Sequence, residues 1–217
     1  GTEAAYKAMK KQGKLPEEKI TKFIAFGGDG GTYDIGLQSL SGAMERGHDM
    51  VYVCYDNGAY MNTGTQRSSA TPHFADTTTA PYGNLDAPFK LAELVAAAGA
   101  TYSARWTTVQ IENLVLAIKE GLENPGFSFI EVATQCPTYF GRKNKLRTPT
   151  AMAAVMKANT VYKSAADRMS AKELEGKIVV GEFANVRKDE FTENIDKISV
   201  EKFGKKTLIN SAYEAEL

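Results

Sequence analysis

The sequence contains 217 residues, of which 43% are hydrophobic and 24% are charged, a composition typical of a globular protein with one sizeable core. The sequence has 26 lysines and arginines and 26 aspartates and glutamates. It therefore has neither the basic excess typical of nucleic-acid-binding proteins nor the acidic excess typical of disordered chains. No apolar run is long enough to span a bilayer, and two cysteines, Cys54 and Cys136, are too few for a disulfide framework. We therefore expect a cytoplasmic protein with no membrane and no nucleic-acid partner.

The first part of the chain predicts alternating helices and strands. Residues 2–11 predict a helix, and residues 20–26 predict a buried strand that stops in a glycine-rich loop. Asp34 is positioned to cap a helix over residues 35–46 that ends at Gly47, and residues 50–55 predict a second buried strand. Together these segments make one βαβ unit, which implies a parallel sheet with helices on both faces, an α/β fold.

Residues 56–88 contain no long periodic segment and are rich in small and polar side chains. A loop of that length in a compact domain is usually functional or disordered. The alternation then resumes, and the expected elements are a helix over 87–98, a strand over 101–106, a helix over 107–123 and a strand over 127–135.

The predicted organisation is one α/β domain over residues 1–148 and a tail over residues 149–217. In the tail we expect helices over about 149–174, a short strand over 177–183 and a polar end. The tail is expected to pack on the domain or on a partner subunit.

The loop after the first strand, Gly27-Gly28-Asp29-Gly30-Gly31, carries the chemistry. Glycines at a strand-to-helix junction let the backbone approach a ligand closely, and the helix N-terminus favours phosphate. Asp29 would repel a diphosphate unless a cation lay between them, and Mg²⁺ takes oxygen ligands from one or two protein groups plus phosphates. Because neighbouring parallel strands end side by side, Asn57 at the end of the second strand is expected to reach the same Mg²⁺ as Asp29.

Two other phosphate-binding patterns are excluded. No third glycine follows at the spacing of the dinucleotide fingerprint, and the chain has no GK[ST] of a Walker loop. A plain glycine turn is the alternative that the loop alone leaves open.

Gly28-Asp29-Gly30 followed by Asn57 resembles the thiamine-diphosphate motif of transketolase-like and decarboxylase enzymes. The longer stretch from Gly28 to Pro72 is similar to the β subunit of pyruvate:ferredoxin oxidoreductase and its relatives, and the resemblance covers at least residues 1–140. It implies a thiamine-diphosphate-binding fold of which this chain is the diphosphate-binding half. The activity it implies is oxidative decarboxylation of a 2-oxoacid to acyl-CoA and CO2, with electrons passed through an iron–sulfur cluster to ferredoxin.

The resemblance also implies roles for single residues. Mg²⁺ would be held by Asp29, the side chain of Asn57 and the main-chain carbonyl of Ala59. Asn62 would lie near the thiazolium and the substrate as a catalytic residue. The implied cofactor-binding residues are Gly28, Asp29, Gly30, Gly31, Thr32, Asn57, Ala59, Tyr60, Asn62 and Thr63.

Cys136 opens a Cys-Pro-Thr sequence that matches the family, where this cysteine is the last of four ligands of a [4Fe–4S] cluster. The other three ligands are expected upstream of Gly1, so the resemblance implies an N-terminally truncated chain. Cys54 lies within a strand and is expected to be a core residue.

The implied partners are an α subunit, γ and δ subunits in some complexes, ferredoxin, coenzyme A and the 2-oxoacid. The glutamate that activates the cofactor's aminopyrimidine would come from another subunit or domain. The chain alone is therefore not expected to be active.

Several alternatives stay open. The GDGGTYDIG and MNTG segments are pyruvate-like, so pyruvate is the first prediction, whereas Cys136–Arg142 is more like the 2-oxoglutarate branch. Branched-chain or aromatic 2-oxoacids and oxalate also remain, as do a non-redox decarboxylase or transketolase subunit and a non-catalytic module. Arg67 is either a contact to an anion or a surface arginine. The basic cluster Arg142, Lys143, Lys145 and Arg147 is either a solvated face or an interface with ferredoxin or a partner subunit.

Overall fold

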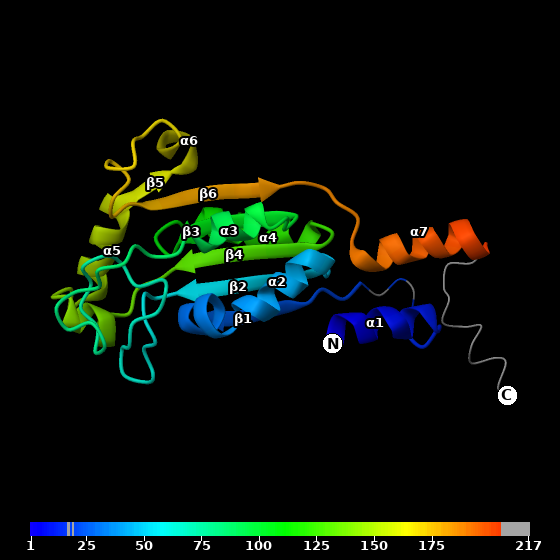
Figure 1. Cartoon of the computed structure of the whole chain (residues 1–217), viewed down its shortest axis with the longest axis horizontal. Coiled ribbons are helices and arrows are strands. Elements are labelled where there is room, and N and C mark those ends of the chain that lie inside the picture. Colours follow the sequence, from blue (N-terminus) through cyan, green and yellow to red (C-terminus); the bar gives the residue numbers. More distant parts are fainter. Residues whose placement is uncertain (17, 19, 205–217) are drawn as a thin grey trace.

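A mostly parallel sheet forms the centre of the molecule (Figure 1). The computed structural model describes residues 1–16, 18 and 20–204. The strands are β1 (Ile24–Gly28), β2 (Met50–Asp56), β3 (Tyr102–Thr107), β4 (Phe127–Ala133), β5 (Thr160–Tyr162) and β6 (Ile178–Asn185). Their order is β1-β2-β4-β3-β6-β5, with β1, β2, β4 and β3 parallel and β6 antiparallel to β3.

Helices cover both faces of this sheet. The side chains of α2 (Leu37–Arg46) and α3 (Leu91–Ala97) pack with Cys54 and Phe129 into one buried cluster. The side chains of α4 (Ile111–Glu123) pack on the opposite face with Val53 and Ile130. This arrangement confirms the predicted α/β fold with helices on both faces.

The first predicted strand is shorter and less buried than expected. β1 begins at Ile24 rather than Ile20, and Ile24 and Phe26 are 43% and 70% exposed. The prediction of a buried strand is therefore wrong. β1 is the edge strand of the sheet, and α4 packs mainly over β2, β3 and β4.

The turn between β1 and α2 also differs from the prediction. A single π-helical turn, η1 (Gly30–Ile35), precedes α2, whose N-cap is Gly36 without a side-chain hydrogen bond. Asp34 is therefore not the cap of this helix; its carboxylate accepts hydrogen bonds from the Ser69 and Tyr60 hydroxyls instead. The predicted stop at Gly47 is confirmed, with a left-handed φ of 58°.

The next two predicted helices start later than expected. α3 begins at Leu91 rather than residue 87, and α4 begins at Ile111 rather than residue 107. Pro88 disfavours helix at residue 87, and Thr107 still belongs to β3.

The C-terminal part contains more regular structure than expected. The elements are η2 (Pro137–Gly141), α5 (Pro149–Asn159), β5, α6 (Lys163–Ala166), β6 and α7 (Phe191–Phe203). β5 interrupts the helical region predicted over 149–174, and α7 lies in the segment expected to be only polar. A capping box of Glu190 and Glu193 starts α7; because its N-cap is a glutamate rather than Ser, Thr, Asp or Asn, the usual sequence signature does not reveal it.

The first and last helices of the described chain lie beside one another (Figure 1). Lys7 of α1 (Thr2–Lys11) contacts Glu190 at 2.6 Å, and Lys11 contacts Asp196 of α7 at 2.5 Å. The division of the chain at residues 148 and 149 stays a prediction, and residues 205–217 of the predicted tail lie outside the described residues. Of the helices that the structure describes, none has the length and apolarity needed to cross a bilayer.

A largely buried ion network fixes α3 to strands β3 and β4 of the sheet. Arg105 on β3 bonds Glu131 of β4 at 2.6 Å and Glu93 of α3 at 2.7 Å. The Glu131 carboxylate also accepts the backbone N–H of Ala92 at 3.0 Å. Because one carboxylate binds both the arginine and the start of α3, the helix has a fixed place on the sheet.

Candidate functional site

The ends of β1 and β2 place the two predicted polar residues at one edge of the sheet. Gly28 pairs with Tyr55 in the parallel register, so Asp29 and Asn57 each follow directly beyond paired strand ends. Asp29 is only 2% exposed, and Ala59 is 1% exposed. Figure 1 shows the arrowheads of β2 and β4 pointing toward the long loop and α5, which surround this edge.

The side-chain amide of Asn57 joins the two segments. One of its two terminal atoms lies 3.2 Å from Asp29 Oδ1 and 2.9 Å from the Ala59 carbonyl oxygen. If the nitrogen occupies this position, it donates a hydrogen bond to each oxygen. If the oxygen occupies it, three acceptors converge with no proton between them, which is favourable only around a cation. The structure thus brings Asp29, Asn57 and Ala59 together.

Ser68 is a member of this site that the sequence analysis did not name. Its hydroxyl donates to Asp29 Oδ2 at 2.5 Å, which leaves Oδ1 facing Asn57. Ser68 lies in the stretch Gly28–Pro72 that carries the family resemblance, but no spacing rule pointed to it. Only the fold of the long loop brings it back to the end of β1.

Burial governs the protonation of the carboxyl groups at this edge. It raises the pKa of Asp29 to about 6, although the hydrogen bond from Ser68 acts in the opposite direction. Burial, with the nearby charge of Asp29, also raises the pKa of Asp56 well above its ordinary value. Two carboxyl groups so close together disfavour each other's charge, and a bound cation would remove this penalty.

The segment after β2 is held in a turn that aims the Ala59 carbonyl. Asp56 Oδ1 accepts the Gly58 N–H at 2.9 Å, and the Thr71 hydroxyl donates to the Gly58 carbonyl at 2.7 Å. Gly58 has a φ of 87°, a conformation that favours glycine. The orientation of Ala59 is therefore set by the backbone, not by a flexible side chain.

The glycine turn after β1 depends on close packing. A Cβ on Gly30 would lie 2.3 Å from the Tyr60 ring, whose hydroxyl donates to the Gly30 carbonyl or to Asp34. The Thr32 hydroxyl donates to the Gly28 carbonyl at 2.7 Å and closes the turn. Gly31, by contrast, is exposed with open space where a Cβ would stand.

Asn62 and Thr63 are not brought to the Asp29–Asn57 cluster. They are exposed and lie in a short turn closed by the bridge between Tyr60 and Gln66. The Thr63 hydroxyl donates to the Gln66 side chain, whereas Asn62 makes no hydrogen bond with its side chain among the described residues. Asn62 is therefore accessible to a ligand.

The long loop is ordered by its own side chains rather than by regular structure. Arg67 donates to Asn84 at 2.7 Å and to Asp86 at 2.8 Å, and Asn84 donates to the Thr71 carbonyl at 2.9 Å. Arg67 was expected to be either a contact to an anionic ligand or a surface arginine. The structure favours a structural role near the surface, because Arg67 cross-links the loop. These hydrogen bonds hold the loop in one conformation beside Asp29.

Cys136 lies at the same edge of the sheet. The Thr134 N–H donates to the Asp56 carbonyl at 2.7 Å, so the segment after β4 runs beside the end of β2. Cys136 is half-buried, whereas Cys54 is buried in the core as predicted, and burial raises the pKa of its thiol. Within the described residues, no three His, Cys, Asp or Glu side chains gather as a metal site.

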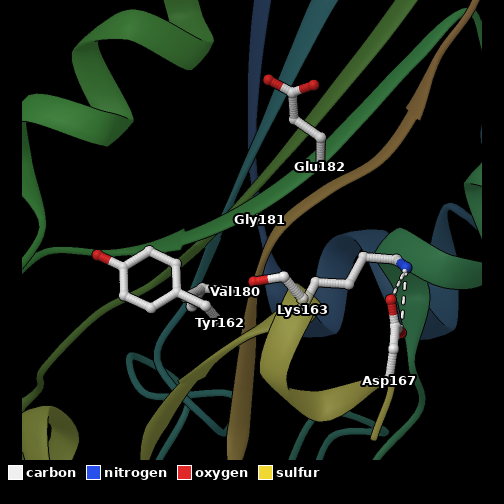
Figure 2. Close-up of a pocket in the computed structure, with 7 residues that line it drawn as sticks. Tyr162, Lys163, Asp167, Val180, Gly181 and Glu182 are labelled. Carbon is white, nitrogen blue, oxygen red and sulfur yellow. Dashed lines mark hydrogen bonds and ion pairs between the residues drawn. The ribbon is translucent and has the colours of Figure 1, made fainter.

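A hollow lies at the opposite edge of the sheet from Asp29 and Asn57 (Figure 2). It lies between β5, α6 and β6, and its lysine, Lys163, is paired with Asp167 at 2.9 Å. Figure 2 shows Glu182 and Tyr162 pointing away from that pair. The lysine of this hollow is already neutralised by Asp167, whereas buried acceptor oxygens converge at the Asp29–Asn57 edge, which is therefore the candidate site.

The fold is an α/β domain whose polar edge site lies at the carboxyl ends of parallel strands, the place where such sheets bind ligands. Residues 7–132 match the family described as thiamine pyrophosphate enzyme, C-terminal TPP binding domain. The chain is 45% identical to the 2-oxoglutarate synthase subunit KorB of Methanothermobacter marburgensis, over 88% of this chain and 67% of that protein. It is 48% identical to the pyruvate synthase subunit PorB of Thermotoga maritima, over 64% of this chain and 45% of that protein.

A solved structure gives the same result. The 2-oxoglutarate:ferredoxin oxidoreductase of Magnetococcus marinus superposes with a TM-score of 0.67 and 25% identity, covering 82% of this chain and 61% of that chain. The protein therefore belongs to the family of 2-oxoacid:ferredoxin oxidoreductase β subunits, as the resemblance implied. It spans about two thirds of the length of the KorB relatives.

The raised pKa of Asp29 predicts a pH dependence of stability in metal-free protein. In the folded state the Asp29 carboxyl keeps its proton up to about pH 6, whereas in the unfolded state it loses the proton near pH 3.9. Proton binding by Asp29 therefore adds to the free energy of unfolding below pH 4, and this contribution is lost as the pH rises through 6. Asp29→Asn should therefore gain up to about 3 kcal/mol relative to the unsubstituted protein between pH 4 and pH 7.5. Urea unfolding in EDTA measures the difference, and a value independent of pH would contradict the prediction.

Proposed function

We propose that Asp29, Asn57 and the Ala59 carbonyl hold a Mg²⁺ ion that carries the diphosphate of thiamine diphosphate. The observation that supports this proposal is the convergence of their oxygens. In octahedral coordination with Mg–O distances of 2.0–2.1 Å, neighbouring ligand oxygens lie about 2.9 Å apart. The separations of 2.9 and 3.2 Å around the Asn57 amide fit that geometry when its oxygen points inward.

The turn after β1 supplies the rest of the diphosphate site. The backbone N–H groups at the start of η1 lie beside Asp29, and a helical N-terminus favours phosphate oxygens. Gly28, Gly30 and Thr32 keep this turn compact, and Gly31 leaves space for a ligand. Tyr60 bonds the Gly30 carbonyl, and Asn62 and Thr63 lie in the exposed turn that follows it; Asn62 is proposed to contact the reacting end of the cofactor and the substrate from there.

The proposed reaction is the oxidative decarboxylation of a 2-oxoacid to acyl-CoA and CO2. The bound cofactor supplies an electron sink for the electrons released as CO2 leaves. This chain's part is to hold and orient the cofactor and to keep its diphosphate neutralised. The glutamate that activates the cofactor, and the other half of its binding site, are proposed to come from an α subunit, so activity requires the assembled complex.

The electron path is proposed to begin next to Cys136. A [4Fe–4S] cluster needs four thiolates, and Cys136, which is half-buried, is proposed to be one of them. The other three ligands would come from outside residues 1–217. Ferredoxin is the proposed acceptor of the electrons and coenzyme A the proposed acceptor of the acyl group.

The identity of the 2-oxoacid is proposed from two observations. The segments GDGGTYDIG and MNTG favour pyruvate, which is the first candidate. The similarity to the KorB subunit extends over 88% of this chain, compared with 64% for the PorB subunit, which favours 2-oxoglutarate as the second candidate.

A substrate panel tests the proposed function. We expect the complex containing this chain to reduce a low-potential dye with one 2-oxoacid and coenzyme A, and Asn57→Ala to lose this activity together with bound thiamine diphosphate. Activity with a single acid would identify the substrate. Full activity in the variant, or reduction that needs no thiamine diphosphate, would show that the proposal is wrong.

Ser68 gives a sharper test of the metal geometry. Removing its hydroxyl in Ser68→Ala leaves Asp29 Oδ2 without its donor, so the affinity for thiamine diphosphate in Mg²⁺ should fall about tenfold, the effect of losing one hydrogen bond to a charged group. Calorimetric titration of the complex measures it. Ser69→Ala is the matched control because that hydroxyl bonds Asp34 instead. Equal losses in both variants would assign the effect to the loop as a whole.

A further inference from the structure

The segment after β4 has a charge balance unlike the rest of the chain. Acidic and basic residues are equal in number overall, yet no Asp or Glu occurs between Glu131 and Asp167. The basic residues in this interval are Arg142, Lys143, Lys145, Arg147, Lys157 and Lys163. Only Lys163 forms an ion pair with a described carboxylate, Asp167. The other five make no ion pair with a described carboxylate and lie on the turn after η2 and on α5, where the nearest bonded acidic residue is Asp76, whose backbone N–H donates to Asn144.

Four of these charges, Arg142, Lys143, Lys145 and Arg147, lie on one turn, here called the basic turn. All four are exposed, so their guanidinium and ammonium groups face solvent. The turn itself is held firmly: the Leu146 N–H donates to the Gly141 carbonyl at 2.7 Å, and Asn144 accepts the Asp76 N–H at 2.8 Å. The charges are thus presented on a fixed backbone rather than on a loose loop.

The basic turn adjoins the proposed cluster ligand. The Gly141 N–H donates to the Cys136 carbonyl at 2.9 Å, so the two ends of η2 are bonded to each other. Pro137, directly after Cys136, lines one hollow with Thr138, Arg142 and Arg147. Positive charge therefore surrounds the point where the proposed electron path reaches the surface of this chain.

A large partner fits this surface better than a small anion does. The two arginines that share the hollow are exposed, and neither is held by a described carboxylate, so they do not form a built pocket for one phosphate. Charges spread over a turn and a helix instead match an extended surface of opposite sign, which speeds encounter and orients the partner.

We propose that the basic turn is the docking surface for an acidic electron-carrier protein of the ferredoxin class. The inference rests on the proposed function, because it assigns the acceptor of the electrons that leave near Cys136. Each encounter would pass one electron to the oxidised carrier, which is itself the oxidant, so no further reactant is needed. Duplex nucleic acid, the other partner that a positive surface attracts, is the competing outcome.

The test is binding of an acidic [4Fe–4S] ferredoxin to the assembled complex, measured by calorimetry at low and high salt, together with dye reduction. The test variant replaces the four charges of the basic turn by glutamine: Arg142→Gln, Lys143→Gln, Lys145→Gln and Arg147→Gln. A control variant removes four exposed lysines elsewhere: Lys14→Gln, Lys119→Gln, Lys172→Gln and Lys188→Gln. We expect the first variant to bind ferredoxin about tenfold more weakly at low salt, with less salt dependence, and the control to change less than twofold.

The outcomes separate this inference from the proposed function. Unchanged ferredoxin binding in the basic-turn variant, or tighter binding of duplex DNA than of ferredoxin to the intact complex, would overturn the docking surface. A basic-turn variant that binds ferredoxin normally but no longer reduces the dye would also overturn the docking surface. The basic turn would then be needed for electron transfer within the complex rather than for binding the carrier. If the unsubstituted complex reduces no dye with any 2-oxoacid, the proposed function fails, while the binding measurement still decides the docking surface.

Discussion

The parallel pairing of β1 with β2 is the constraint on which the site depends. Because Gly28 lies opposite Tyr55, the residues just beyond the two strand ends meet, and Asp29 comes within 3.2 Å of the Asn57 amide. An antiparallel pairing, or a shift of register, would separate the carboxylate from the amide. The electrostatics follow from the same contact, since a buried carboxylate beside a second carboxyl group, Asp56, favours a cation over a bare charge.

The long loop and the turn after β4 are built around this edge. The loop has no strand or helix, yet Arg67 and Asn84 cross-link it so that Ser68 reaches Asp29. A donor on one carboxylate oxygen leaves the other oriented for a metal. The same edge receives the segment with Cys136, so the proposed cofactor site and the proposed exit for electrons share one side of the sheet. The strands of this domain therefore set the positions of the site residues, and the loops at the ends of the strands supply the side chains and carbonyl groups of the site.

Sequence patterns predicted the parts whose causes are local. The strand–loop–helix pattern around Gly28–Gly31 and the stop at Gly47 depend on glycine conformations, and the pairing of Asp29 with Asn57 depends on βαβ geometry. Ser68 was missed because its contact with Asp29 joins residues far apart in the chain, through a loop without periodicity. Asp34 was misassigned as a cap because a π-helical turn, which no short-range pattern signalled, rotates it toward Ser69 and Tyr60. The exposure of Phe26 could not be read from its sequence, since it depends on which strand stands at the edge.

The most direct test of the central claim is a crystal structure of the assembled complex with thiamine diphosphate and Mn²⁺, whose anomalous scattering locates the metal. The account predicts one Mn²⁺ peak within about 2.3 Å of Asp29 Oδ1, the Asn57 amide oxygen and the Ala59 carbonyl oxygen, with diphosphate oxygens completing the coordination. A metal bound elsewhere, or an Asn57 amide whose nitrogen still donates to Asp29 and Ala59 with the cofactor in place, would contradict it.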